Sequence, residues 1–212
     1  IYFLILFFFF FFVSCTETVA PVLTGSISGF VNLYEEDGSQ INDKSGVKVS
    51  IEGRNNYAYT NNDGRYNLEN VEAGIFNVVF EKAGYGPHKV IAREFVGGGD
   101  AYLYSIALMV LPSFNVTSLI ITKTTGSFPY LRMSGNLSDT REYSRKVVLF
   151  FGKNENVSND PMNYLYVNTA YIDQDSSSYS SSLYYKEYLL DSGFNSGETV
   201  HVAAYSTSNG YW

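Results

Sequence analysis

Hydrophobic and polar residues alternate along much of this chain with the period of two that is typical of β-strands. Val47, Val49 and Ile51 are each separated by a polar residue, which predicts a strand whose odd positions face a core. Further strands are predicted at 26–34, 88–92, 101–111, 116–122, 130–137, 146–151, 163–171, 180–190 and 199–205. Turns rich in Gly, Asn, Asp and Ser separate these segments, and long helical patterns are hard to find. The pattern predicts an all-β fold.

The stretch 57–85 carries the clearest turn chemistry. Asp63 and Gly64 accept the positive backbone angles of tight turns and predict a hairpin between strands on either side. A second turn ends at Gly74, and the apolar run 75–80 after it predicts a central strand. Gly84 closes the segment, so that Asp63, Gly64, Gly74 and Gly84 are the predicted structural turn residues.

The order of these features, from Asn-Asp-Gly-Arg-Tyr at 62–66 to Lys-Ala-Gly-Tyr at 82–85, resembles the carboxypeptidase-regulatory-like domain of bacterial surface proteins. The resemblance covers residues 25–108. It implies a transthyretin-like β-sandwich, and it implies the non-catalytic accessory domain of that family, not its peptidase.

Two consecutive antiparallel β-sandwiches are the expected organisation of the 212 residues, because this length suits two small domains. The first is predicted over 25–111 and the second over 113–212, with Pro112 at the boundary. The evenly spaced short strands of the second half resemble an immunoglobulin or fibronectin-III-like module. Its last strand reaches Trp212 without a stop signal, so the chain could be the N-terminal piece of a longer protein.

An apolar run opens the chain at 1–13 and is followed by Ser14 and the single cysteine, Cys15. The run is too short for a transmembrane helix and suits a signal peptide. Residues 12–15, Phe-Val-Ser-Cys, resemble the lipobox of bacterial lipoproteins, with Phe12 in place of the usual Leu. The resemblance implies a signal peptide over 1–14, diacylglyceryl and palmitate groups on Cys15, a tether over 15–24 and a place at the bacterial outer membrane. The alternative is an ordinary secretory signal in which Cys15 is incidental.

Composition and spacing argue against several kinds of chemistry. A net charge of −7 and a pI near 4.8 do not suit nucleic-acid binding. Neither His88 nor His201 has the nearby Glu of a zinc peptidase site, and the serines at 176–182 lack a nucleophile elbow. Asn61, Asn62 and Asp63 are too few for a calcium loop. We therefore expect no catalytic residue, no metal and no cofactor.

Tyrosines remain as candidate ligand-binding residues. Tyr164 and Tyr166 are expected on one face of a strand, and Tyr184 and Tyr185 on the next strand, where rings could stack on a sugar or a protein partner. Ordinary half-buried strand tyrosines are the simpler interpretation. The predicted function is a non-catalytic cell-envelope lipoprotein that acts as a structural or binding module. The alternative is a carbohydrate-binding accessory protein of a polysaccharide-uptake system.

Overall fold

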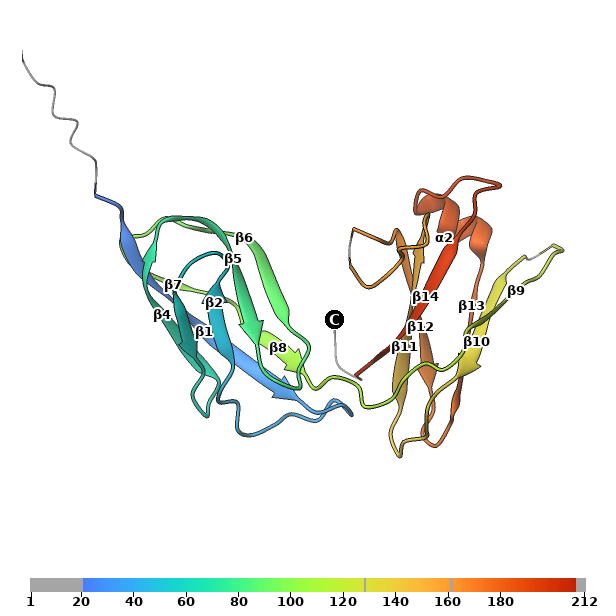
Figure 1. The fold of residues 1–212 in the computed structure, drawn as a ribbon, viewed down its shortest axis with the longest axis horizontal. Helices are drawn as coiled ribbons and strands as arrows, with labels where there is room; N and C mark the ends of the chain where they lie inside the picture. Colours follow the sequence, from blue (N-terminus) through green and yellow to red (C-terminus); the bar gives the residue numbers. More distant parts are fainter. Residues whose placement is uncertain (1–20, 128, 161, 209–212) are drawn as a thin grey trace, which may run out of the picture.

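A computed structural model describes residues 21–127, 129–160 and 162–208 (Figure 1). The predicted signal peptide, the lipidation residue Cys15 and most of the predicted tether lie outside the described residues. The regular structure of the described residues is β-strand apart from one short helix, and buried hydrophobic residues form two separate clusters, one before and one after Pro112. The all-β prediction is confirmed.

Between residue 21 and Pro112 the structure has eight strands, which form two sheets. One sheet has the order β4-β1-β7, with β8 also paired to β1, and the other has the order β3-β2-β5-β6. The bounds are β1 Thr24–Tyr34, β2 Lys48–Ile51, β3 Tyr57–Tyr59, β4 Arg65–Glu72, β5 Gly74–Glu81, β6 His88–Phe95, β7 Asp100–Tyr102 and β8 Ile106–Met109.

The core between these sheets follows the alternation of the sequence. Val47, Val49 and Ile51 are buried as predicted, and in β1 the odd positions Ile27, Val31 and Leu33 are fully buried as well. Each such side chain contributes about 2 kcal/mol when it leaves water. Removing apolar surface from water is therefore the main force that joins the two sheets.

The pairing of these strands differs from the predicted hairpins. A tight turn does form at Gly64, where φ is +83° and the Gly64 amide donates to the Asn61 carbonyl at 2.8 Å. However, β3 pairs with β2 and β4 pairs with β1, so the turn carries the chain from one sheet to the other. The turn at Gly74 does the same between β4 and β5. Of the three predicted turns, only the one at Gly84 joins two paired strands, β5 and β6.

The prediction of one closing strand at 101–111 is also corrected. Two short strands, β7 and β8, occupy this segment, and both pair with β1 in parallel. The sheet is therefore mixed, because β4 pairs with β1 antiparallel on its other edge. The register of β1 against β4 shifts between Gly25 and Ile27.

In the described residues after Pro112, up to residue 208, there are six strands and a short helix. The sheets have the orders β13-β10-β9 and β12-β11-β14, all antiparallel. The bounds are β9 Ile120–Lys123, β10 Leu131–Asn136, β11 Arg145–Gly152, β12 Tyr166–Ile172, β13 Ser178–Leu183, α2 Tyr185–Asp191 and β14 His201–Thr207.

The predicted strand at 180–190 is half wrong, because α2 replaces its second part. Lys186 and Glu187 interrupt the alternation, whereas Tyr185 and Leu189 are four residues apart and meet the core from one helix face. The sequence signal for the helix was thus present at the i, i+4 spacing.

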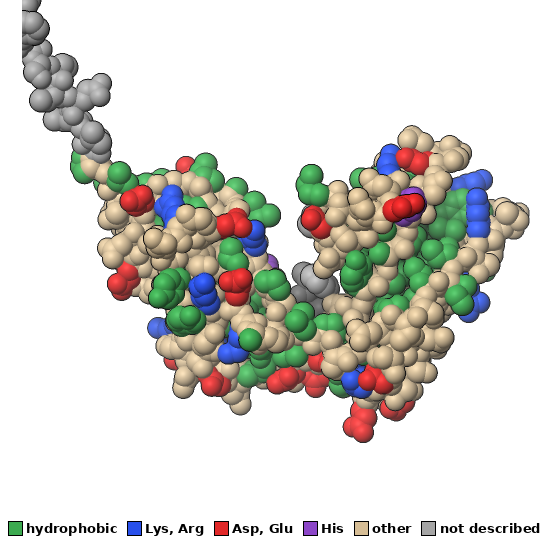
Figure 2. Space-filling model, viewed as in Figure 1, with side chains coloured by type: hydrophobic (Ala, Val, Ile, Leu, Met, Phe, Trp, Pro, Cys, Tyr) green, Lys and Arg blue, Asp and Glu red, His purple; other side chains and the backbone are tan. Residues whose placement is uncertain are grey.

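One side of this second sandwich is more open than the other. Where β12 leads into β13, Ser181 Oγ donates to Asn168 Oδ1 at 2.6 Å and links the two sheets. At the opposite side, Val202 and Ala204 of β14 pack against the core but stay only half-buried. Figure 2 shows hydrophobic side chains at the surface between β14 and β9.

Polar contacts hold the junction between the two halves. The Glu36 carboxylate accepts hydrogen bonds from the amide of Ser113 at 3.1 Å and from its hydroxyl at 2.7 Å. Arg141 Nη2 also donates to the Ser113 hydroxyl, at 2.8 Å. The hydroxyl of Ser208, just after β14, donates to the carbonyl of Val110. The segment around Pro112 is therefore fixed from both sides.

Candidate functional site

The outer face of the β12-β11-β14 sheet is unusually apolar for an antiparallel sandwich, whose outer faces are normally polar. The register places Phe150 of β11 between Val167 and Ala203, and Val148 opposite Tyr205. We call this surface the aromatic face; it is made by Lys146, Val148, Phe150, Tyr164, Val167, Thr169, Tyr171, Ala203, Tyr205 and Thr207.

Ring contacts organise the aromatic face. The Phe150 ring lies 4.9 Å from that of Tyr164 and 5.7 Å, edge to face, from that of Tyr205. Such pairs hold the rings in fixed orientations. At the other end, the Lys146 ammonium is 5.8 Å from the Tyr171 ring, which is 74% exposed. The rim is exposed while the Phe150 ring between Tyr164 and Tyr205 is buried.

Tyr164 and Tyr166 do not share a face, which corrects the sequence prediction. The Tyr166 ring packs against the core residue Phe151 at 5.6 Å, whereas Tyr164 contacts Phe150 on the outside. Strand β12 begins only at Tyr166, so the period of two does not extend back to Tyr164. Of these two tyrosines, only Tyr164 belongs to the aromatic face.

Tyr184 and Tyr185 lie near α2 and do not join the aromatic face. Tyr184 is at the N-cap position and is exposed. Tyr185 packs against the core, with the Lys123 ammonium 5.0 Å from its ring. The predicted tyrosines are therefore spread over separate parts of the second half. Tyr171 and Tyr205 were missed, although the unbroken apolar run 147–151 signals a strand that is apolar on both faces.

The predicted turn residues shape the path of the backbone. Gly64, Gly74 and Gly84 have φ values of +83°, +151° and +83°. At the first turn, Asn61 Oδ1 accepts hydrogen bonds from the amides of Asp63 at 3.1 Å and Arg65 at 2.8 Å. The Asn61 side chain, not that of Asp63, therefore organises this turn.

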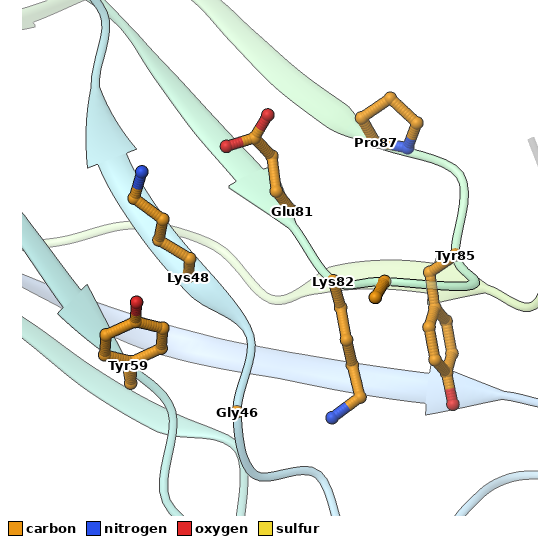
Figure 3. A pocket seen from close by; sticks show the side chains of 8 residues that line it. Gly46, Lys48, Tyr59, Glu81, Lys82, Tyr85 and Pro87 are labelled. Atoms are coloured by element: carbon orange, nitrogen blue, oxygen red, sulfur yellow. The ribbon is translucent and has the colours of Figure 1, made fainter.

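A second surface feature is a hollow in the first half, at the β3-β2-β5 end of its sheet (Figure 3). The hollow has a volume of about 470 Å³ and is open to solvent. We call it the lysine–tyrosine hollow; it is lined by Gly46, Lys48, Tyr59, Glu81, Lys82, Ala83, Tyr85 and Pro87. Lys48 sits between Tyr59 and Glu81 across neighbouring strands, while Lys82 and Tyr85 come from the turn after β5.

Local contacts fix the groups of this hollow. The Lys82 ammonium donates to the Ser45 carbonyl and lies 5.9 Å from the Tyr85 ring. Partial burial raises the pKa of the Tyr85 hydroxyl, and the negative charge of Glu35 raises it further. Hydrogen bonds from Ser45 lower the pKa of the Asp43 carboxyl, and the charge of Lys82 contributes. The Asp43 carboxylate is thus a negatively charged neighbour of Lys82 outside the hollow.

The two histidines are strand residues. His88 begins β6, and its ring lies 6.2 Å from the core ring of Phe80; burial lowers its pKa. His201 begins β14. Within residues 21–208, apart from positions 128 and 161, no group of three or more His, Cys, Asp or Glu is placed to hold a metal ion. In the same ranges no helix has the length and apolarity to cross a membrane.

Neither a protein-family model nor a curated protein matches this sequence. Among solved structures, a mutant type II cohesin–X-dockerin complex from Acetivibrio cellulolyticus is 23% identical over 41% of this chain and 58% of that chain, with a TM-score of 0.37. The match thus spans little more than half of that chain.

Two longer matches come from Bacteroides. One is a Bacteroides uniformis protein that is provisionally described as carbohydrate-binding. It is 20% identical, with a TM-score of 0.30, and the match covers 78% of this chain and 81% of that protein. A DUF3823 family protein of Bacteroides ovatus is 14% identical, with a TM-score of 0.28. The match covers 89% of this chain and 96% of that protein. At these TM-scores the likenesses carry no argument about function.

Proposed function

We propose that this chain is a non-catalytic cell-envelope module that is anchored through lipid on Cys15 and binds another envelope protein through the aromatic face. The observation that carries the proposal is the apolar outer side of the β12-β11-β14 sheet. An antiparallel sheet normally turns polar residues to water on this side. Here Val148 and Phe150 are already buried, while Val167, Tyr171 and Tyr205 remain exposed and offer apolar surface to a partner.

The composition of the aromatic face favours a protein over a sugar as its partner. Aliphatic Val148 and Val167 lie between the tyrosines, and Lys146 is the only charged side chain among its members. Interface cores are rich in aromatic residues and poor in charge. A sugar, by contrast, needs hydrogen-bonding groups beside a flat ring.

Photocrosslinking in intact cells tests this interface. Replacing Tyr171 with benzoyl-phenylalanine is expected to give one discrete adduct to a protein after irradiation, because position 171 lies at the exposed rim of the aromatic face. The same replacement at Tyr104, which is 60% exposed and belongs to the first half, serves as the matched control and should give none. Equal adduct patterns at both positions, or no adduct at Tyr171, would contradict the proposed interface.

The anchor is proposed from the sequence around Cys15, which follows an apolar run and is the only cysteine. One acyl chain holds a protein only marginally, while two or more hold it firmly, so a lipidated Cys15 would keep the chain at the outer membrane.

Labelling with radioactive palmitate checks the anchor. We expect label in the wild-type chain and its complete loss in Cys15→Ala, because no other thiol is available. Incorporation that is the same in both chains would remove the anchor from the proposal without affecting the aromatic face.

Carbohydrate binding, as an accessory function of a polysaccharide-uptake system, is the second candidate. A different observation favours it: the lysine–tyrosine hollow combines an exposed tyrosine ring with hydrogen-bonding groups of both kinds. The two functions are compatible, since the aromatic face and the hollow belong to different halves of the chain.

A further inference from the structure

The lysine–tyrosine hollow offers a ring on which another ring can stack. Tyr59 is 60% exposed, and its ring meets that of Tyr57 edge to face at 6.0 Å and 80°. This arrangement braces the Tyr59 ring from one side. The C–H groups of a sugar ring match the electron-rich face of an aromatic ring, so Tyr59 can serve as a stacking platform.

Hydrogen-bonding groups surround this platform. Lys48 and Lys82 bring ammonium donors, and Glu81 brings a carboxylate acceptor, to one hollow (Figure 3). The hydroxyls of a sugar both donate and accept, so neighbouring hydroxyls can use a lysine and a carboxylate together. The contact of Lys82 with the Ser45 carbonyl keeps that side chain in place before a ligand arrives.

The charges of the hollow are close to balanced. Two lysines and one glutamate line it, and the Asp43 carboxylate lies near Lys82. A strongly anionic ligand would meet these two carboxylates, and a cationic one would meet both lysines. The balance favours a neutral ligand that has many hydroxyl groups.

We propose that the lysine–tyrosine hollow binds a neutral pyranose unit of an oligosaccharide or polysaccharide, stacked on Tyr59 and hydrogen-bonded by Lys48, Lys82 and Glu81. The open form of the hollow lets a sugar chain enter and leave, so an internal unit fits as well as an end. This inference rests on the carbohydrate-binding candidate and gives it a site and a substrate class. It does not depend on the aromatic face.

The test titrates the full chain, in detergent micelles, with neutral glucan, xylan and mannan oligosaccharides and with an oligogalacturonate, followed by calorimetry and by amide NMR shifts. We expect a neutral oligosaccharide to bind and Tyr59→Ala to weaken it by about tenfold or more, a loss of about 1.4 kcal/mol. Glu81→Ala should also weaken binding. Tyr104→Ala, which removes a ring of the same 60% exposure elsewhere in the first half, should leave it unchanged.

The outcomes separate the site from the wider function. Neutral binding that depends on Tyr59 and Glu81 supports the proposal. Binding that survives Tyr59→Ala but is lost in Tyr171→Ala overturns the hollow and moves carbohydrate recognition to the aromatic face. Binding of the acidic oligosaccharide alone overturns the neutral class. No binding to any of the four overturns both the hollow and the carbohydrate-binding candidate, while the envelope-protein interface would still be judged by its own crosslinks.

Discussion

Gly64→Ala is expected to destabilise the first half of the chain by about 3 kcal/mol, which lowers its melting temperature by more than about 10 °C. Two effects add. Gly64 has φ of +83°, a conformation that costs an L-residue about 1–2 kcal/mol. In addition, a Cβ at this position would lie 2.1 Å from the Val31 carbonyl oxygen, so the backbone of β1 or of the turn must move. The shift would also strain the hydrogen bond from the Val31 amide to the Gly64 carbonyl, which is 2.9 Å long.

Gly53→Ala is the matched control for this prediction. Gly53 has φ of +75° but nothing within 4 Å of an added Cβ, so it should show the conformational cost alone, about 1 kcal/mol. Calorimetry and hydrogen exchange of the β1 amides measure both variants. If the two alanines cost the same, β1 and the turn do not approach each other as closely as described.

Arg145→Ala is expected to destabilise the second half by about 3 kcal/mol. The side chain is 1% exposed, and its guanidinium donates to the carbonyls of Asp139, at 3.1 Å, and Ser176. It also lies 4.8 Å from the Phe114 ring. Truncation leaves two carbonyls without their donors and a gap beside the ring. The Asp139 carboxylate, 3.6 Å from Arg145 Nη1, is itself 38% exposed and can be hydrated, so it adds little to the loss.

Two further variants separate volume from hydrogen bonding at this position. Arg145→Met restores most of the volume but no donor, so it should recover only part of the stability. Arg141→Ala removes the other partner of Asp139, a pair at 2.6 Å near the surface, together with the hydrogen bond to Ser113, and should cost much less stability than Arg145→Ala. A methionine variant as stable as the wild type would show that the buried guanidinium contributes no net stability.

Much of the fold follows from local sequence rules. The predictions that failed concern strand pairing and surfaces, which depend on contacts between segments far apart in the sequence. The alternation at Val47, Val49 and Ile51 correctly predicted a buried strand face, because burial of every second residue depends only on the strand itself. The Asp63-Gly64 step correctly predicted a turn. It could not predict that β4 pairs with β1, whose paired residues lie about forty positions earlier in the sequence. A turn reverses the chain but does not determine which sheet the next strand joins.

The candidate surfaces were less accessible to sequence reasoning. A period of two placed Tyr164 beside Tyr166, but the strand starts only at Tyr166 and the rings lie on opposite sides of the sheet. The lysine–tyrosine hollow needs Lys48 and Tyr59 from one hairpin and Lys82 and Tyr85 from a later turn. None of these residues is unusual in its own segment, so no local signal marks the hollow.

The parallel pairing of β1 with β7 and β8 has a mechanical consequence. Because β8 runs in the same direction as β1, the chain enters the first sandwich at residue 24 and leaves it near residue 109 at the opposite end (Figure 1). A pulling force between these ends acts along β1 and β8 and loads their backbone hydrogen bonds in shear, many at a time. Strands stretched in this way resist far greater tension than strands that are peeled apart bond by bond.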